Sequence, residues 1–440
     1  MKIAFVTQPF DIVVPGFGGS TSIPILTYKF AQYLANAGHQ VLIYGRQDGN
    51  HPDVEQDGEH IEFRRIHTQW EDLWLKPFKL ISKLQGGRRT KRPLFAHSLY
   101  YTYYIQQVAQ DLQAEQCDII HIHNFSQFIL PVRRHNPQAK IVLHMHCEWL
   151  TQLDQQLITS RLQQCDLILG VSSHITNLIK QRFPEHAAKC QTVYNGVDVE
   201  YFSPQPVNRQ PVNRQPVNRH PETTSPHLIF SGRVSPEKGI HVLIDAFHQV
   251  LATFPDAELQ IVGPIAVSPA QFIVALSDDE HVQKLADFYT GNDYYAQLQA
   301  RIAPHAADQI VFLGFMPQPE LRELYQAADI LVNPSLTEAF GMSLAEAMSM
   351  ETAVIGANVG GMKDVVVDGE TGYLVEPANA TALAEAIKQL LADDNLRHKM
   401  GKAGRQRSVS LFSWNSVSET LLSLYQHVVP STSTPSVETV

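Results

Sequence analysis

Short apolar runs alternate with longer amphipathic stretches along most of the chain. In the runs, Val, Ile and Leu follow one another with little polar alternation, as in residues 167–171 and 330–333. Such runs are typical of parallel strands that are covered on both faces. The stretches between them, such as residues 25–37 and 241–253, place apolar residues at helical spacing. The pattern predicts an α/β protein with doubly wound parallel sheets.

The predicted strands fall into two groups that are separated by an irregular stretch. The first group comprises residues 3–7, 40–44, 119–123, 141–146, 167–171 and 191–194. The second group comprises residues 228–231, 258–262, 310–313, 330–333 and 353–355. A chain of 440 residues is long enough for two domains, so we expect two Rossmann-like domains that face a cleft.

The predicted division of the chain has five parts. An N-terminal domain covers residues 1–204 and a C-terminal domain covers residues 227–411. The linker between them, residues 205–226, contains QPVNR three times in tandem, and its Pro and polar residues cannot bury a core. Residues 412–429 are predicted to form an amphipathic C-terminal helix, and residues 430–440 a disordered tail.

Composition narrows the class of protein. A net charge of −10 argues against non-specific binding of nucleic acid, which needs a basic surface. The four cysteines include no CxxC pair, so they give no zinc or redox signature and favour a reducing compartment. We find neither a signal peptide nor an apolar stretch long enough to span a bilayer, and we expect a cytoplasmic protein.

Three segments carry candidate chemistry. The turn at residues 15–20, PGFGGS, has consecutive glycines that let a backbone approach phosphate at a helix start, although it is not the GxGxxG of a dinucleotide site. Arg233 and Lys238 follow a strand and would clamp a diphosphate, or else are surface cations. Glu338 and Glu346 flank a predicted helix start and would bind vicinal hydroxyls, or else are ordinary helix acids.

Taken together in their order, these strings resemble a retaining glycosyltransferase of family 4 (group 1), which has the GT-B fold. The resemblance implies that the helix of residues 412–429 crosses back to the N-terminal domain. The resemblance covers nearly the whole chain. The matching strings are Gly18-Gly19, Val193 to Asp198, Gly232-Arg233 through Lys238-Gly239, Glu338 through Glu346, Gly360-Gly361 with Val365-Val366, and Asp368 to Val375.

The resemblance implies a role for each matching position. Arg233 and Lys238 would bind the donor diphosphate, Glu346 the ribose, and Glu338 the transferred sugar. The amides of Phe340, Gly341 and Met342 would lie near the donor phosphate and sugar. Gly18 and Gly19 would let the first loop reach the donor phosphate or the acceptor.

A histidine beside the reacting sugar is also implied by the resemblance. His146 ends a predicted strand and is the preferred candidate, which makes it a catalytic residue with Glu338, Arg233 and Lys238. His144 is the alternative, because alternation along a strand puts both side chains on one face. One position departs from the family pattern: Asp364 stands where the family often has Glu after its Gly-Gly pair.

The implied reaction moves a hexosyl group from a nucleotide-diphosphate sugar to a glycan, lipid or small-molecule acceptor, with retention of configuration, in bacterial polysaccharide or glycolipid synthesis. We expect no metal and no cofactor, since two cations and a helix start would stabilise the leaving phosphate. A nucleotide-sugar epimerase and a non-catalytic scaffold of the same fold are the alternatives. An epimerase would turn over donor without acceptor.

Two stretches interrupt the regular pattern. Residues 264–293 form an irregular insertion that is either a lid or a surface excursion. Residues 76–92 contain seven Lys and Arg and no acid, and Trp70 and Trp74 precede them. Basic segments with aromatic residues bind anionic lipid headgroups or an anionic acceptor, or are solvated loops. The stretch from Lys76 to Arg92 is therefore a candidate for peripheral contact with the inner membrane face.

Overall fold

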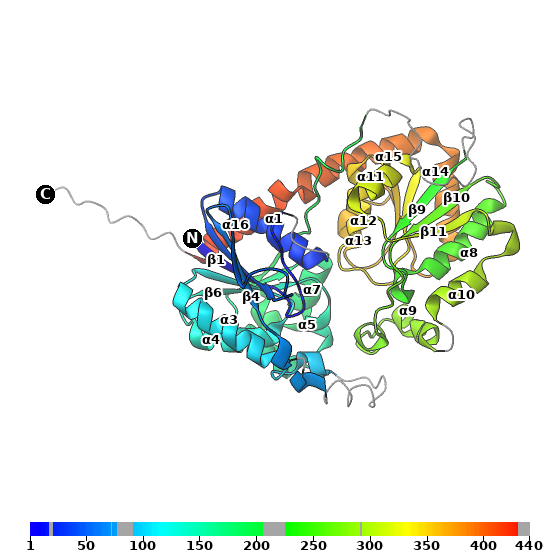
Figure 1. The fold of residues 1–440 in the computed structure, drawn as a ribbon. Coiled ribbons are helices and arrows are strands. Elements are labelled where there is room, and N and C mark those ends of the chain that lie inside the picture. Colours follow the sequence, from blue (N-terminus) through cyan, green and yellow to red (C-terminus); the bar gives the residue numbers. More distant parts are fainter. Residues whose placement is uncertain (17–20, 72, 77–90, 206–224, 291–292, 430–440) are drawn as a thin grey trace. The chain divides into compact units, whose positions relative to one another are not determined.

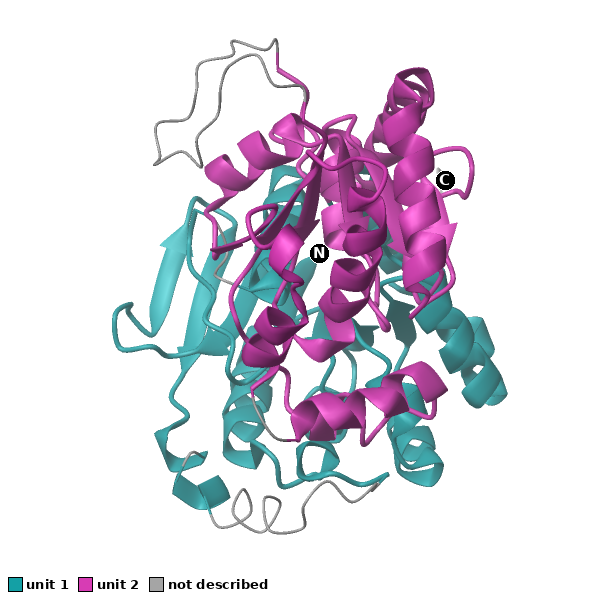
Figure 2. Ribbon diagram, turned by 90° about the vertical axis from the view of Figure 1, so that its right-hand side faces the viewer, with its two compact units in different colours: residues 1–196, 414–440 teal, residues 197–413 magenta. Residues whose placement is uncertain are grey.

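The computed structural model describes residues 1–16, 21–71, 73–76, 91–205, 225–290 and 293–429 (Figure 1). The chain divides into two compact units, coloured in Figure 2: unit 1 is Met1–Gly196 with Trp414–Val440, and unit 2 is Val197–Ser413. Residues 206–224 of the predicted linker and the predicted tail, residues 430–440, lie outside the described residues.

Unit 1 contains an eight-stranded sheet in the order β3-β4-β2-β1-β5-β6-β7-β8. Only the β3–β4 pair is antiparallel among the described pairs. The strands are β1 (Lys2–Val6), β2 (Gln40–Arg46), β3 (Val54–Asp57), β4 (Ile61–Ile66), β5 (Ile119–His123), β6 (Lys140–Met145), β7 (Leu167–Gly170) and β8 (Cys190–Thr192). The α-helices are α1 (Ser22–Asn36), α3 (Thr102–Glu115), α4 (Ile129–His135), α5 (Trp149–Gln152), α6 (Gln155–Leu162), α7 (Ser173–Arg182) and α16 (Trp414–Val428), and the 3-10 turns are η1 (Leu94–Ala96), η2 (Ser126–Phe128) and η3 (Pro184–Lys189).

Helices α1 and α16 lie side by side on one face of this sheet (Figure 1). Phe30 of α1 meets the Trp414 ring edge-on, with ring centroids 6.0 Å apart. Both helices bury apolar side chains against the strands. Leu421 of α16, for example, belongs to the same buried cluster as Phe5 of β1. The last helix in the sequence is thus part of the core of the first unit, where its apolar face is buried.

Unit 2 contains a six-stranded parallel sheet in the order β11-β10-β9-β12-β13-β14. The strands are β9 (His227–Ser231), β10 (Glu258–Val262), β11 (Ile310–Gly314), β12 (Ile330–Asn333), β13 (Ala353–Ala357) and β14 (Tyr373–Val375). The α-helices are α8 (Ile240–Leu251), α9 (Glu280–Gln283), α10 (Tyr294–Arg301), α11 (Gln318–Ala327), α12 (Met342–Ser349), α13 (Met362–Val365), α14 (Ala380–Ala392) and α15 (Asp394–Arg407). Single turns η4 (Pro236–Lys238), η5 (Ala270–Phe272), η6 (Lys284–Tyr289) and η7 (Pro304–Ala306) and a π-helical turn, η8 (Ser408–Phe412), complete the unit.

Strands β9 and β12 are neighbours in this sheet although about a hundred residues separate them in sequence. Because both run in the same direction, the loops that follow them emerge at the same edge. The loop after β9 begins at Gly232, and the loop after β12 begins at Pro334. The predicted phosphate and sugar residues of unit 2 lie on these two loops.

Unit 1 ends at Gly196, before the predicted limit at residue 204. The segment that follows is bonded within unit 2: the Val197 amide donates to the Phe412 carbonyl at 2.6 Å, and the Arg405 guanidinium donates to the Phe202 carbonyl at 3.3 Å. The sequence could not reveal this, because the boundary depends on which distant carbonyls the segment meets.

Candidate functional site

The loop after β9 is held in a tight turn that displays one cation and buries its neighbours. Arg233 is exposed, whereas Val234 and Pro236 are buried. Gly239 ends the loop with φ +68°, and a Cβ at this position would lie 2.1 Å from the carbonyl oxygen of Pro334. Only glycine tolerates that approach, so the loops after β9 and β12 are in direct backbone contact.

Glu237 joins three segments of this region. Its side chain is 3% exposed, and its carboxylate accepts hydrogen bonds from Ser235, from the Ser268 hydroxyl at 3.0 Å and from Arg233 at 3.2 Å. Its backbone carbonyl accepts from the amide of Leu336 at 2.8 Å. A buried carboxylate needs several donors to offset its lost hydration. In accepting from Arg233, the Glu237 carboxylate also holds that side chain in position.

Lys238 and Glu338, which are a hundred residues apart in sequence, form an ion pair. Their Nζ and Oε2 atoms lie 2.7 Å apart, and their side chains are 18% and 17% exposed. The carbonyl oxygen of Glu338 accepts from the Gly361 amide at 2.9 Å. A Cβ on Gly360 would lie 1.9 Å from that carbonyl oxygen, so this Gly-Gly pair lets its backbone approach the Glu338 loop closely.

Helix α12 starts directly after this loop. Gly341 is its N-cap residue, with φ +109°, and Met342 is the first helical residue. The first N–H groups of a helix have no intrahelical acceptor and favour anions. Phe340 is 1% exposed and its ring meets that of Phe412 edge-on at 5.3 Å, which anchors the helix start.

Glu346 lies one turn further along α12. Burial raises the pKa of its carboxyl group to about 7, and the hydrogen bond that the Tyr325 hydroxyl donates to it at 3.0 Å partly opposes that shift. Tyr325, on α11, is fully buried and also belongs to the site. Sequence reasoning missed it because a lone tyrosine in an amphipathic helix has no distinguishing spacing.

The insertion at residues 264–293 packs against the loop after β12. Val282 and Leu285 form a small apolar cluster with Leu336. Ser268, near its start, is bonded to Glu237 as described above. The described part of the insertion therefore braces both loops of the site, and sequence reasoning had not connected it with them.

In unit 1, His146 immediately follows the end of β6. It is half-buried, and its amide donates to Oδ1 of Asn124 at 2.7 Å. His144, the alternative candidate, is completely buried and is bonded to His121. Both side chains lie on the same face, as alternation predicts, but only His146 is accessible.

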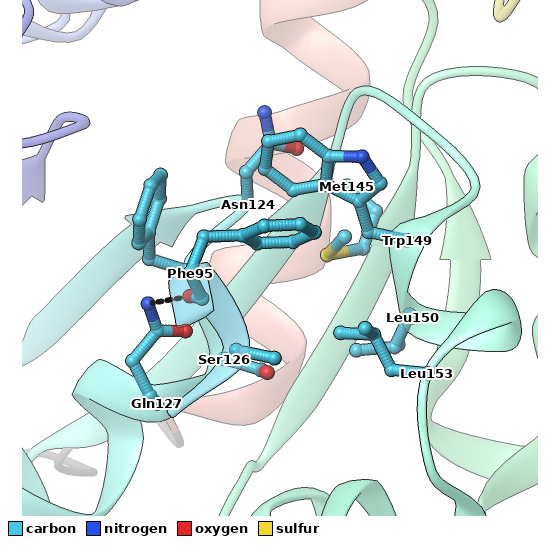
Figure 3. Close-up of a pocket in the computed structure, with 10 residues that line it drawn as sticks. Phe95, Asn124, Ser126, Gln127, Met145, Trp149, Leu150 and Leu153 are labelled. Carbon is cyan, nitrogen blue, oxygen red and sulfur yellow. Dashed lines mark hydrogen bonds between the residues drawn. The ribbon is translucent and has the colours of Figure 1, made fainter. Parts of the chain in front are cut away.

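Asn124 also lines a small cavity of unit 1, drawn in Figure 3. The Phe95 and Trp149 rings lie 4.5 Å apart at its wall, and the Gln127 side chain donates to the Phe95 carbonyl at 2.9 Å. The cavity volume is about 10 Å³, which admits at most one water molecule. It is a packing feature of the core and is too small for a sugar.

The structure does not describe all of the predicted positions. Gly18, Gly19 and residues 77–90 of the basic stretch lie outside the described residues. Asp364 is half-buried in the short helix α13. None of the helices in the described ranges combines the length and hydropathy that a bilayer-spanning segment needs.

Comparison with known families supports a single class of protein. Residues 24–201 match the family model described as Glycosyltransferase Family 4, and residues 213–407 match Glycosyl transferases group 1. The chain is 28% identical over 347 residues to the putative glycosyltransferase YtcC of Bacillus subtilis (strain 168), covering 78% of this chain and 80% of that protein.

Solved structures share the architecture. The sucrose-phosphate synthase of Thermosynechococcus elongatus is similar, with a TM-score of 0.71, 22% identity and coverage of 97% of this chain and 99% of that chain. Anabaena Alr3699/HepE in complex with UDP-glucose is similar with a TM-score of 0.63, 18% identity and coverage of 97% and 100%. At these identities the likeness establishes the fold.

Proposed function

The chain belongs to the group 1 glycosyltransferases of family 4 and has the GT-B fold; from this premise we propose that it transfers a hexosyl group from a nucleotide-diphosphate sugar with retention of configuration. The observation that carries the proposal is the Lys238–Glu338 ion pair beside Arg233, on two loops fixed to each other by Glu237 and Gly239. The acceptor is a glycan, a lipid or a small molecule.

Each charged group of unit 2 has a part in donor binding. Arg233 and Lys238 hold the diphosphate, and the amides at the start of α12 lie near its phosphate and sugar. The Glu346 carboxylate accepts from the ribose hydroxyls. A UDP-glucose complex of a protein with the same fold supports a nucleotide sugar as the donor.

The ion pair suggests how the donor is received. A diphosphate that approaches Lys238 competes with Glu338 for the ammonium group. Once Lys238 turns to phosphate, the Glu338 carboxylate is free to accept hydrogen bonds from the sugar hydroxyls. The two side chains thus keep each other ordered before the donor arrives, which reduces the reorganisation needed at binding.

In the transfer itself, the bond between the anomeric carbon and the phosphate oxygen breaks, and a bond to the acceptor oxygen forms on the same face. Configuration is retained because the acceptor enters on the face that the phosphate leaves. The acceptor's proton passes to the departing phosphate oxygen, which balances the charge. Arg233 and Lys238 stabilise the negative charge that develops on the phosphate. These fixed cations support a reaction that needs neither metal nor cofactor.

A lipid-linked or membrane-bound acceptor gains support from unit 1. Trp70, Leu73 and Trp74 are 68%, 56% and 58% exposed, and their spacing puts them on one face of a helical segment. Lys76 follows them, and Lys91 and Arg92 are exposed at the far end of the basic stretch. Exposed indoles beside cations suit the interface of an anionic membrane.

All four cysteines are free thiols, which supports the expected cytoplasmic location.

The test is a panel of UDP-, GDP- and ADP-sugars with the full chain in EDTA. Thermal shift reports binding, and nucleotide release with and without glycan or lipid acceptors reports transfer. We expect one nucleotide series to raise the melting temperature, and its release to grow with acceptor. Release without acceptor, together with an altered sugar, would support an epimerase. No shift with any donor would favour the scaffold alternative.

A further inference from the structure

Two chains of hydrogen-bonded imidazoles cross the face of the unit 1 sheet that α1 and α16 cover. In the first chain, Thr27 Oγ1 of α1 lies 3.1 Å from His123 Nε2, and His123 Nδ1 lies 2.9 Å from His146 Nε2. In the second, the Tyr425 hydroxyl of α16 lies 2.6 Å from His121 Nδ1, and His121 Nε2 lies 3.2 Å from His144 Nδ1.

The chains lie side by side because β5 and β6 pair in parallel. His123 is opposite His144 in the register, and the rings of His144 and His146 have centroids 4.3 Å apart. His121, His123 and His144 together have the spacing of a metal site, with ligand atoms within 4.8 Å of one another. Five of their six ring nitrogens, however, already have a hydrogen-bond partner, so mutual hydrogen bonding explains the cluster.

All four imidazoles are neutral. Burial lowers the pKa of His144 to about 3, and it holds the pKa values of His121, His123 and His146 well below the ordinary value. A neutral imidazole has one N–H and one bare nitrogen. Each chain of bonds must therefore run in a single direction, and the group at its buried end decides which.

Thr27 sets the direction of the first chain. Its hydroxyl donates to the carbonyl oxygen of Ile23, one helical turn earlier, at 2.8 Å. The single hydroxyl hydrogen is thereby used, so Thr27 accepts from Nε2–H of His123. His123 then has a bare Nδ1, which accepts from Nε2–H of His146. The bare nitrogen of His146 is therefore Nδ1.

We propose that Thr27 and His123 are positioning residues that hold His146 as its Nε2–H tautomer, so that Nδ1 accepts a hydrogen bond from a hydroxyl group of the substrate. The part of this inference that concerns a substrate rests on the proposed function. The tautomer of His146 does not depend on that function. Among the residues that the structure describes, none is hydrogen-bonded to Nδ1 of His146, and the side chain is only half-buried.

The backbone keeps the imidazole in this place. The His146 amide is bonded to Asn124, and Thr27 and His123 are both completely buried. An imidazole fixed through Nε2 cannot rotate to present a donor without breaking a buried hydrogen bond. A hydroxyl of a sugar or acceptor would meet an acceptor nitrogen there, and the opposite tautomer would present N–H instead.

The experiment reads the tautomer directly, by 15N NMR of the full-length protein with 15N-labelled histidine side chains and no ligand. His146→Gln serves only to assign the signals. Thr27→Val removes the accepting oxygen, Thr27→Ser keeps it, and Tyr425→Phe removes the corresponding hydroxyl of the second chain. Turnover with the donor found in the panel is measured for the same Thr27 variants.

We expect His146 to carry its proton on Nε2 in the wild type, in Thr27→Ser and in Tyr425→Phe. In Thr27→Val an Nε2–H on His123 would be buried without an acceptor, so His123 should change tautomer and His146 should carry its proton on Nδ1. Turnover should then fall about tenfold or more, with Thr27→Ser within about twofold of wild type.

A wild-type His146 protonated on Nδ1 overturns the inference, and so does a Thr27→Val protein whose His146 tautomer is unchanged. If Thr27→Val fails to fold, the wild-type spectrum still decides the matter. Because the tautomer is read without substrate, an absence of transfer with every donor overturns the proposed function, whereas the opposite tautomer overturns this inference alone.

Discussion

In unit 1 four hydrogen-bonded imidazoles lie on or directly after β5 and β6, whereas in unit 2 the charged side chains of the site lie on the loops after β9 and β12. The imidazoles His121, His123 and His144 are fully buried, and each is bonded to a neutral partner. By contrast, Arg233 in unit 2 is 48% exposed and Lys238 is 18% exposed. The difference follows from hydration, because a buried imidazolium would lose its water whereas a loop at a sheet edge retains it.

Glu237 is the exception that clarifies the contrast. Its side chain is almost fully buried, and its carboxylate is hydrogen-bonded to three donors. Unit 1 satisfies its buried groups by sharing protons along chains, and unit 2 satisfies Glu237 by surrounding it. Substitutions should therefore separate the functions of charge in unit 2 and of neutral hydrogen bonding in unit 1.

The largest effect on activity is expected at the charged side chains of the loops in unit 2. Lys238→Ala should lower kcat/KM for transfer by about 10²–10³-fold, because one cation that stabilises the leaving phosphate is lost. Steady-state nucleotide release measures it. Lys388→Ala is the matched control, since Lys388 is paired with Glu385 on the surface of the same unit. A Lys238→Ala enzyme within threefold of wild type would contradict the donor site.

The buried charge should matter more for stability. Glu237→Ala should lower the free energy of unfolding by about 2–4 kcal/mol, because two hydroxyls and Arg233 lose their acceptor. Urea denaturation measures the change. Glu385→Ala, at an acid that is 65% exposed and paired with Lys388, should change it by less than about 0.5 kcal/mol. Equal effects of the two substitutions would remove the distinction between them.

Glu346 should make stability fall with rising pH. Its folded-state pKa of about 7 exceeds the ordinary 4.5, so between these values the unfolded chain ionises first and stability is lost; above pH 7 the loss is complete. Glu346→Gln should therefore be more stable than wild type by about 1–3 kcal/mol at pH 8 and nearly equal to it at pH 4. Donor affinity of the wild type should rise with pH through 7. Thermal denaturation and donor titration at both pH values test this, and a pH-independent difference would contradict it.

The smallest effect concerns two hydroxyls on α16. Tyr425→Phe should cost about 1–2 kcal/mol of unfolding free energy, because His121 loses its partner in the core. Ser418 is equally buried, but its hydroxyl has no hydrogen-bond partner among the described residues. Ser418→Ala should therefore be neutral or slightly stabilising. Chemical denaturation measures both changes. A larger loss of unfolding free energy in Ser418→Ala than in Tyr425→Phe would show that the Tyr425–His121 hydrogen bond does not stabilise the fold.

Much of the fold followed from local patterns. Residues 330–333 were predicted as a strand with the same limits that the structure gives them, because a parallel strand that is covered on both faces gives a nearly continuous apolar run. Residues 119–123 were also predicted with the limits of the structure, although the buried His121 and His123 alternate with isoleucines there. The predictions omitted β3, β4 and β14. Strand β3 contains only one apolar residue, and β14 has three residues, so neither gives a run that stands out from a loop.

The candidate site was predicted only in part. Arg233, Lys238, Glu338 and Glu346 were found through their resemblance to a family pattern, and the structure places the first three on the loops after β9 and β12 and Glu346 within α12. Ser268 and Tyr325 were not found. Their importance lies in a single contact each, with Glu237 and Glu346, and no spacing along the chain announces such a contact.

The sequence by itself determined the α/β class, the two groups of strands and the residue types of the site. These depend on the spacing of apolar residues and on the charges within short segments, which are local properties of the chain. Only the tertiary structure decided which residues pair: Lys238 with Glu338, and Thr27 with His123 and His146. It also separated accessible His146 from buried His144. Hydrogen bonds and ion pairs depend on distances of a few ångströms between segments far apart in sequence, and those distances exist only after the sheets have formed.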